Sequence, residues 1–208
     1  DALALSVLTW LQSLEGGQMV ALYCSDVSGA FERVCEERLG GKLERSGLHP
    51  RILKLLKSWL EPRSSAVVLD GCSSAPQVLQ NSVYQGTVLG PPLWNVHYAD
   101  SKLAVQAEGF SEVVFADDLN CSKVMPSATT ETQARSALRK CQTSLHRWGA
   151  ANKIIFDPGK ESFHGIHRTK HFGEDFKILG VIFDCQLTMR SAAVEISKEA
   201  GWKVKSLL

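Results

Sequence analysis

The sequence predicts an α+β fold. Three observations support this class: helical patterns of apolar residues alternate with short apolar runs, the order of helices and strands is mixed rather than strictly β–α–β, and two apolar runs flank a pair of acidic residues as the arms of a hairpin flank a turn. The chain has 208 residues, which is enough for one large or two small domains with a buried core.

Helices are predicted where apolar residues recur at helical spacing. The first is expected to end at Gly16-Gly17, and Pro62 bars the continuation of the second. Ser28 is expected to cap a further helical stretch that turns Phe31 and Val34 inward. The predicted helices are 3–14, 51–60, 91–108, 130–149 and one that begins at about Arg190.

Strands are predicted at short apolar runs bounded by turn residues. The run that starts at Met19 stops at Asp26, and a pair of strands is expected around a turn at Ser73-Ser74. Asp117-Asp118 is expected at the tip of the acidic hairpin. The predicted strands are 19–24, 66–69, 77–83, 113–116, 119–124, 153–156, 162–167 and 176–183.

The composition excludes several classes of protein. Hydrophobic residues make up 44% and charged residues 22% of the chain, and no run of about eighteen apolar residues is present to cross a membrane. No signal peptide is visible at the N-terminus, so an intracellular location, nuclear or cytoplasmic, is expected. The six cysteines lie far apart, which favours a thiol-reducing setting over a disulfide framework. A net charge of +1 gives no global sign of nucleic-acid binding.

Asp26 and the pair Asp117-Asp118 are the candidates for chemistry, because each stands where an apolar strand ends. Three gathered carboxylates repel one another unless a cation lies between them. Mg²⁺ or Mn²⁺ suits such oxygen ligands, and two ions can hold the attacking and leaving oxygens of a phosphoryl displacement. The alternative is structural, because an Asp-Asp turn is ordinary in a hairpin.

Five segments resemble, in order, the sequence boxes of reverse transcriptases (RNA-directed DNA polymerases) of the non-LTR, LINE-like retrotransposon kind. The boxes span nearly the whole chain, and although each is weak alone, the ordered set is specific. They are Asp-Val-Ser-Gly-Ala-Phe at 26–31, Gln-Gly-Thr-Val-Leu-Gly-Pro-Pro-Leu-Trp-Asn at 85–95, Phe-Ala-Asp-Asp at 115–118, the set Trp148, Asn152, Pro158 and Lys160, and the Leu-Gly strand at 176–184.

The resemblance implies a right-hand polymerase palm, an antiparallel sheet with helices packed on one face, together with partial fingers. It also implies that the sequence is a fragment, and that other regions of a parent polyprotein (endonuclease, missing fingers and thumb) are its partners. The implied divisions are a residual fingers or palm helix at 1–20, palm at 21–40, fingers at 41–80, palm at 81–190 and the start of the thumb at 191–208.

The resemblance further implies roles for individual residues. Asp26, Asp117 and Asp118 would be catalytic and would hold two Mg²⁺ or Mn²⁺ ions. Lys160 would protonate or neutralise the departing pyrophosphate, with a solvated surface lysine as the alternative. Phe31 would exclude a 2′-hydroxyl, with a core phenylalanine as the alternative. The implied nucleotide-binding residues are Val27, Gly29, Ala30, Phe31, Gln85 and Gly86.

The implied function is addition of deoxynucleotides from deoxynucleoside triphosphates to a primer 3′-hydroxyl, with an RNA template and a DNA primer as partners and no membrane. A catalytically inactive nucleic-acid-binding remnant of the same fold is the main alternative. A receiver-type domain, with Asp117-Asp118 binding magnesium and Asp157 accepting phosphate, is a third interpretation. It is disfavoured because the residues after the acidic pair predict a returning strand rather than a helix.

Overall fold

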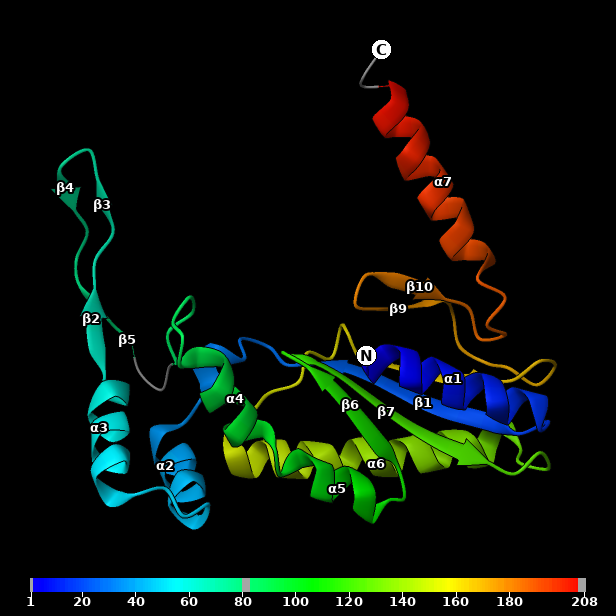
Figure 1. The fold of residues 1–208 in the computed structure, drawn as a ribbon, viewed down its shortest axis with the longest axis horizontal. Helices are drawn as coiled ribbons and strands as arrows, with labels where there is room; N and C mark the ends of the chain where they lie inside the picture. Colours follow the sequence, from blue (N-terminus) through cyan, green and yellow to red (C-terminus); the bar gives the residue numbers. More distant parts are fainter. Residues whose placement is uncertain (1, 80–82, 206–208) are drawn as a thin grey trace. The chain divides into compact units, whose positions relative to one another are not determined.

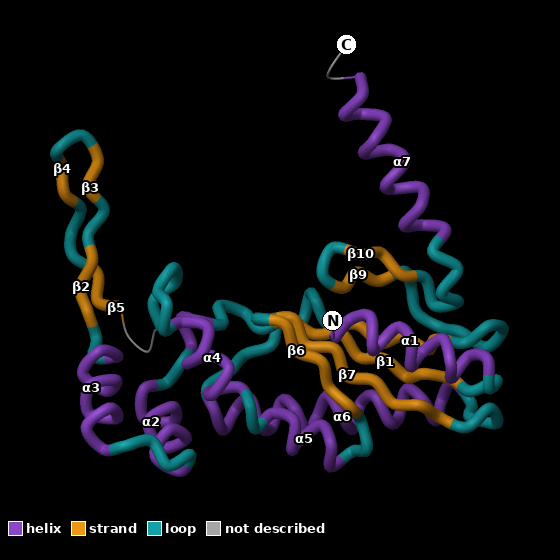
Figure 2. Tube along the Cα trace, viewed as in Figure 1, coloured by secondary structure: helices purple, strands orange, loops and turns teal. Residues whose placement is uncertain are grey.

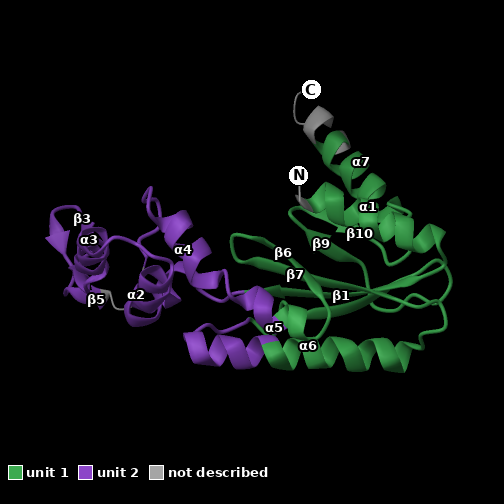
Figure 3. Ribbon diagram, turned by 60° about the horizontal axis from the view of Figure 1, so that its bottom comes forward, with its two compact units in different colours: residues 1–26, 105–144, 157–208 green, residues 27–104, 145–156 purple. Residues whose placement is uncertain are grey.

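The computed structural model describes residues 2–79 and 83–205, and the chain forms two compact units (Figure 3). Unit 1 comprises Asp1–Asp26, Val105–Ser144 and Asp157–Leu208. Unit 2 comprises Val27–Ala104 and Leu145–Phe156. No helix in the described ranges is both long and apolar enough to cross a membrane.

Unit 1 is built on a four-stranded sheet with the order β6-β7-β1-β8 (Figure 1). Every neighbouring pair of strands is antiparallel, which confirms the α+β class. The hairpin predicted around Asp117 is confirmed as β6 and β7, and the first predicted strand extends to Asp26. The strands are β1 (Met19–Asp26), β6 (Ser111–Phe115), β7 (Asp118–Met125) and β8 (Ser162–Ile166).

Alternate side chains of β1 pack on opposite faces of this sheet. On one face, helix α1 (Ala2–Glu15) and the hairpin of β9 (Phe176–Ile178) and β10 (Val181–Phe183) form a core with β1 and β8. Its buried members are Trp10, Leu14, Val20, Leu22, Ile166, Phe176, Ile178, Phe183, Cys185 and Leu187. The Trp10 ring makes edge contacts with the rings of Phe176 and Phe183.

The opposite face of the sheet is covered by the part of helix α6 (Glu131–Asn152) that belongs to unit 1 (Figure 3). Tyr23 and Cys121 are paired across β1 and β7 on this face, and the thiols of Cys121 and Cys141 of α6, both free, share a hydrogen bond. Helices were predicted on one face of the sheet only. The structure has helices on both faces, because α6 covers one face and α1 covers the other. Helix α7 (Arg190–Lys205) begins at the residue predicted.

Unit 2 contains short helices and a long hairpin (Figure 2). The helices are a 3₁₀ turn at Phe31–Arg33, α2 (Glu36–Arg45), α3 (Pro50–Leu60) and α4 (Gly90–Tyr98), and α5 (Ser101–Ala107) begins in this unit. The hairpin consists of β2 (Arg63–Ser65), β3 (Val68–Leu69), β4 (Cys72–Ser73) and β5 (Gln77–Leu79). Its arms pair as β2 with β5 and β3 with β4.

Several local predictions were wrong. Ser28 caps no helix, because the 3₁₀ turn starts three residues later, after Ala30, and has no side-chain cap. The hairpin turns at Asp70-Gly71, both with positive φ, rather than at Ser73-Ser74. The segment 91–108 forms two helices instead of one, and the segment 176–183 forms two short strands. The segment 153–156 is no strand, since only an isolated bridge joins Phe156 to Val27. Residues 80–82 of the strand predicted at 77–83 lie outside the described residues.

Candidate active site

Asp26 and Asp118 are direct neighbours across two strands. Asp26 is the last residue of β1, Asp118 is the first residue of β7, and the antiparallel register places the two opposite each other. Directly opposed residues project to the same face of a sheet, and their Cβ atoms lie about 4.5–5.5 Å apart. The structure thus brings together two of the three carboxylates predicted to converge, although they are 92 positions apart in the chain (118 − 26).

Asp117 occupies the turn between β6 and β7. Ala116 has φ of +55°, and Phe115 pairs with Asp118 across the turn, so only Ala116 and Asp117 lie between the arms. A positive φ at the first central residue is the geometry of a type II′ turn, which matches the twist of the strands it joins. Asp117 is exposed to solvent, whereas Asp118 is half-buried. The acidic pair therefore divides between the turn and the first position of β7.

Lys160 forms an ion pair with Asp26. Its Nζ lies 2.6 Å from Oδ2 of Asp26, and the Asp26 side chain is 13% exposed while that of Lys160 is 61% exposed. The loop that carries Lys160 is attached to the end of β1, because the amide of Asp157 donates to the carbonyl of Asp26 at 3.0 Å. Lys160 is thus a specific partner of the acidic site rather than an unpaired surface lysine.

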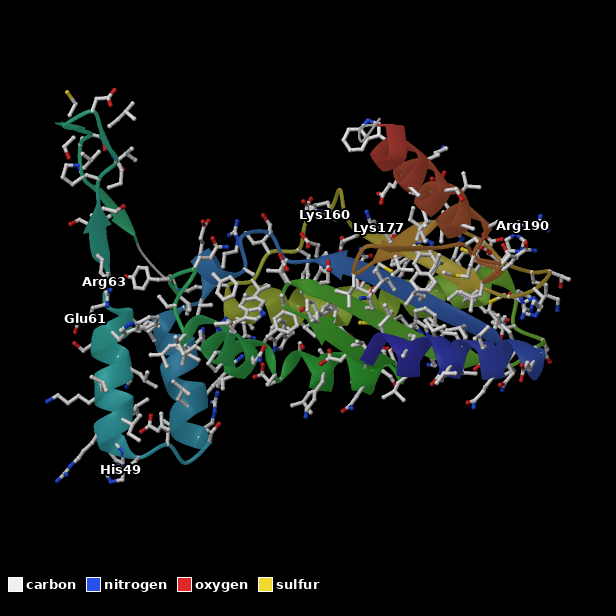
Figure 4. The ribbon with its side chains drawn as sticks, turned by 45° about the horizontal axis from the view of Figure 1, so that its top comes forward. His49, Glu61, Arg63, Lys160, Lys177 and Arg190 are labelled. Atoms are coloured by element: carbon white, nitrogen blue, oxygen red, sulfur yellow. The ribbon has the colours of Figure 1, made fainter. Side chains whose placement is uncertain are left out.

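A pocket of about 200 Å³ opens on this face of the sheet. It is lined by Cys24, Ser25, Asp26, Asp118, Asn120, Lys160, Lys177 and Ile178. Asn120 and Lys177 were not predicted as site residues. Asn120 follows Asp118 by two residues on the same strand, so the period of a strand could have placed it on the same face. Lys177 comes from β9, which no local pattern links to the acidic hairpin (Figure 4).

The electrostatics of the pocket reflect the burial of Asp118 and the closeness of its carboxylates. Burial raises the pKa of the Asp118 carboxyl, the charges of Asp117 and Asp26 raise it further, and the Lys160 ammonium acts in the opposite direction. The pKa of Lys160 is raised, first by its hydrogen bond to Asp26 and then by the charges of the surrounding carboxylates. The ionised form of Asp118 is therefore repelled by the neighbouring carboxylates, and a nearby cation reduces this repulsion.

The donor set suits a hard divalent cation, because carboxylate and amide oxygens are the ligands that Mg²⁺ and Mn²⁺ prefer. Asp26 and Asp118 supply such oxygens from directly opposed positions of two strands, and Asn120 lines the same pocket. Within residues 2–79 and 83–205, no group of three His, Cys, Asp or Glu side chains is already arranged to hold a metal ion. One Asp26 oxygen is instead engaged by Lys160.

The residues predicted to bind the nucleotide belong to unit 2. Val27 is buried and its backbone bridges Phe156. Gly29 has φ of +62°, a conformation that glycine adopts without strain, and Ala30 is buried beside it. The main chain is therefore exposed at Gly29 and buried at Ala30.

Phe31 and the Gln85-Gly86 turn lie close together within unit 2. The amide of Val83 donates to the carbonyl of Phe31 at 2.8 Å, which attaches the segment before the turn to the Phe31 backbone. The Phe31 ring is half-buried, and its centroid lies 6.0 Å from that of Trp94. Gln85 and Gly86 are exposed, and Gly86 has φ of +77°. Phe31 is therefore partly a packing residue and partly accessible.

Comparison with known proteins identifies the family. No family model matches the chain. It is 30% identical over 199 residues to an RNA-directed DNA polymerase from the mobile element jockey of Drosophila funebris, a match that covers 86% of this chain and 21% of that protein. It is 26% identical over 215 residues to the jockey polymerase of Drosophila melanogaster, covering 93% and 23% of the two chains. The chain belongs to the reverse transcriptases of non-LTR retrotransposons.

A third relative of this reverse transcriptase segment is a probable RNA-directed DNA polymerase from the Drosophila melanogaster transposon BS, 30% identical over 141 residues, which are 61% of this chain and 14% of that one. The segment spans about a fifth of the length of the jockey proteins. Its fold is that of the telomerase of Candida tropicalis, with a TM-score of 0.65 and 12% identity over 90% of this chain and 39% of that one. The predicted right-hand polymerase fold is thereby confirmed.

Proposed function

We propose that this chain is the palm of an RNA-directed DNA polymerase that adds deoxynucleotides to a primer 3′-hydroxyl. The observation that carries the proposal is the pairing of Asp26 with Asp118 at one end of the sheet, with Asp117 in the adjoining turn and Lys160 on Asp26. The homology to retrotransposon polymerases supports the same reaction. The substrates and partners that follow are deoxynucleoside triphosphates, an RNA template and a DNA primer.

In this proposal Asp26, Asp117 and Asp118 are the ligands of divalent cations, Mg²⁺ or Mn²⁺. Two such ions, when bound, lower the pKa of the attacking hydroxyl and neutralise the triphosphate. The protein supplies the carboxylates at the ends of two paired strands, so the cradle is held by the hydrogen bonds of the sheet. Lys160 supplies an exposed ammonium beside the cradle that can neutralise or protonate the pyrophosphate leaving group.

Unit 2 supplies the nucleotide-binding residues in the same proposal. The main chain at Gly29 can approach phosphate closely, because this residue is exposed and has no side chain, and the buried Val27 and Ala30 flank it in the same segment. The Phe31 ring excludes a 2′-hydroxyl, and the exposed Gln85-Gly86 turn contacts nucleotide and template. A polymerase grips an RNA–DNA hybrid through backbone and shape, so we expect affinity that falls as salt rises. We also propose an intracellular location, consistent with six free cysteines.

A primer-extension assay tests the proposal. The chain is mixed with an RNA template, an annealed DNA primer, deoxynucleoside triphosphates and Mg²⁺, and incorporation is followed on a sequencing gel. We expect extension by the wild type, none by Asp117→Asn, and wild-type extension by Glu131→Gln, which removes a carboxylate from a surface pair on α6. Incorporation that survives in Asp117→Asn overturns the proposal.

The inactive remnant is the second candidate, favoured by one observation: Lys160 already occupies an oxygen of Asp26. Binding of the RNA–DNA hybrid by the wild type without incorporation, at any Mg²⁺ or Mn²⁺ concentration, identifies this second candidate. The receiver-type interpretation is wrong, because the strand that starts at Asp118 is antiparallel to both of its neighbours, whereas a receiver domain carries its acidic residues on a parallel sheet.

A further inference from the structure

The ion pair between Lys160 and Asp26 is built into the fold. The Asp157 amide donates to the Asp26 carbonyl at 3.0 Å, and the Lys160 amide donates to the Asp157 carbonyl at 3.0 Å. A further bond of 2.9 Å joins the Gly159 amide to Oδ1 of Asp157. These three hydrogen bonds hold the turn at the end of β1, so the Lys160 side chain starts from a fixed point next to the carboxylate that it neutralises.

Glu161 secures the other side of the same turn. Its Oε1 accepts a hydrogen bond from the buried Tyr23 hydroxyl, and its Oε2 accepts one from Nε2 of Gln142 at 3.0 Å. Glu161 therefore ties the residue after Lys160 to β1 and to α6 at once. A loop held at both ends presents Lys160 to Asp26 in a defined geometry, which distinguishes this pair from a chance contact of two mobile surface side chains.

We propose that Lys160 is an internal counter-ion that competes with divalent cations for Asp26, so that cation binding and release of Lys160 are one coupled event. The inference rests on the proposed function in one respect, namely that the acidic pocket binds a divalent cation. The inference adds two points to that function. Lys160 neutralises Asp26 while no cation is bound, and it becomes free to act on the pyrophosphate only when the cation binds.

Competition follows from the position of the charges. The Lys160 ammonium lies 2.6 Å from Oδ2 of Asp26 and takes up one lone-pair site of that oxygen, so a cation that approaches the same oxygen meets the ammonium. An ammonium that stayed there would also repel the cation, because like charges a few ångströms apart interact unfavourably even near a surface. Lys160 is 61% exposed, so water can solvate it when it leaves. The pair is therefore specific in geometry but weak enough to be displaced.

Lys177 shows why displacement does not leave the pocket without basic groups. It lines the same pocket from β9, and Figure 4 labels both Lys177 and Lys160. Because the 157–161 turn is attached to β1, a displaced Lys160 stays within a side-chain length of the carboxylates. The coupling is reciprocal. The factor by which Lys160 weakens cation binding equals the factor by which the bound cation weakens the contact of Lys160 with Asp26.

Binding of Mn²⁺ to the chain tests the proposal without any need for polymerase activity. Free Mn²⁺ is measured by electron paramagnetic resonance during titration of the wild type, Lys160→Gln and Lys140→Gln. Lys140 is an exposed lysine of α6, so its variant matches the change in net charge without touching the pocket. We expect Lys160→Gln to bind Mn²⁺ about fivefold more tightly than the wild type, and Lys140→Gln to bind as the wild type does.

A second measurement follows the lysine itself. In a chain labelled with ¹³C-lysine, Mg²⁺ is expected to move the Lys160 side-chain resonances toward those of a free lysine, along the same titration curve as cation binding. In Glu161→Gln, where the turn loses a charged anchor, we expect a smaller Mg²⁺-induced shift, because Lys160 is less firmly held on Asp26 before the cation binds.

The outcomes separate this inference from the proposed function. Equal or weaker Mn²⁺ binding by Lys160→Gln, with binding still lost in Asp26→Asn, overturns the competition and leaves the cation site intact. If Lys160→Gln and Lys140→Gln gain Mn²⁺ affinity equally, the effect comes from net charge alone, and this result also overturns the competition. No binding by any variant, or binding that Asp26→Asn does not weaken, removes the cation site and with it both proposals.

Discussion

Asp26 and Asp118 lie opposite each other in the antiparallel pair of β1 and β7, each at the end of its strand. Like charges directly opposite each other destabilise a sheet. The fold accepts this cost at one end of its central strand pair and relieves it in part through Lys160. Functional sites often contain arrangements that cost stability, such as two like charges on opposed strand positions.

Asp118→Asn is expected to stabilise the chain at neutral pH in the absence of divalent cations. Burial and the charges of Asp117 and Asp26 raise the pKa of Asp118 in the folded state, so the ionised carboxylate costs stability at every pH above that value. Below the pKa of the unfolded chain both states are protonated and the cost disappears. The gain is about 0.5 kcal/mol for this half-exposed group, or a rise in Tm of about 1–2 °C.

Thermal unfolding from pH 4 to pH 8 measures this difference. The advantage of Asp118→Asn over the wild type is expected at pH 7 and is expected to shrink as the pH falls toward 4. Millimolar Mg²⁺ should raise the Tm of the wild type more than that of the variant, because a cation that binds the folded state stabilises it by mass action. An asparagine variant that is less stable at pH 7 would show that the carboxylate stabilises the fold.

The local part of the acidic site could be predicted from sequence. Apolar runs that end at Asp26 and flank Asp117-Asp118 define strand ends, and a two-residue turn defines the hairpin register. The resemblance implied that Asp26 and Asp117-Asp118 share metal ions, but the pairing of β1 with β7 along the whole of both strands was not predicted, because it depends on tertiary structure. The contribution of Lys177 depends on how β9 packs over the sheet, and no pattern within β9 records that.

The misplaced hairpin turn of unit 2 has a different cause. Asp70-Gly71 was a stronger turn signal than Ser73-Ser74, because both central residues adopt positive φ and Asp-Gly suits that geometry. The break between α4 and α5 was not visible in the apolar pattern. Asp100 stands at this break and accepts bonds from Lys42 and Trp148, so distant residues determine where the helix stops.

Asp184 is expected to hold the turn that precedes α7. Its carboxylate accepts hydrogen bonds from the amides of Gln186, Thr188 and Met189 and from the Thr188 hydroxyl. Burial alone would raise the pKa of Asp184, but these bonds together lower it. The stability they confer is thus complete above the unfolded pKa of about 4 and is lost as the pH falls through the folded pKa.

Urea unfolding at pH 7 should show a loss of about 1–2 kcal/mol in Asp184→Asn, because the neutral amide makes weaker hydrogen bonds. Glu199→Gln, an exposed change on α7, serves as the control and should be neutral. The difference between Asp184→Asn and the wild type should narrow at pH 3. A pH-independent loss would assign the effect to side-chain shape instead of charge.

Lys42 and Asp100 are expected to be energetically coupled within unit 2. Nζ of the buried Lys42 lies 2.7 Å from Oδ1 of Asp100, which also accepts a bond of 2.9 Å from Nε1 of Trp148. Removal of Lys42 leaves Asp100 with the Trp148 bond and partial solvation, since its side chain is 39% exposed, so Lys42→Met should cost about 1–2 kcal/mol. In a double-mutant cycle with Asp100→Asn, the double variant should cost at least about 1 kcal/mol less than the sum of the singles. Additive losses would contradict the coupling.

Phe31 is expected to select deoxynucleotides in the proposed polymerase. The ring is half-buried and stands 6.0 Å from the Trp94 ring, which limits its movement. Phe31→Ala should therefore raise incorporation of ribonucleotides relative to deoxynucleotides by roughly tenfold in single-nucleotide extension. Phe31→Tyr keeps the ring and should retain the wild-type preference. If the alanine variant also retains that preference, Phe31 is a packing residue.

Gly165→Ala is expected to destabilise unit 1 by displacing the Phe172 ring, on which the Arg135 guanidinium also packs. The backbones of Gly165 and Phe172 exchange two hydrogen bonds, of 2.9 and 3.1 Å, and the Phe172 ring lies directly over the glycine. A Cβ at Gly165 would lie 2.2 Å from Cε1 of Phe172, so the ring or the backbone must move. The expected loss is about 1–3 kcal/mol in urea unfolding, as for other overpacked sites.

Gly41→Ala is the matched control for this substitution. Gly41 lies within helix α2, and a Cβ there would meet no atom within 4 Å. Because alanine is a better helix former than glycine, this variant should gain about 0.5–1 kcal/mol. If Gly165→Ala lowers the free energy of unfolding and Gly41→Ala raises it, the loss at Gly165 comes from the close approach of the Phe172 ring. A neutral Gly165→Ala would mean that the ring has room to turn away.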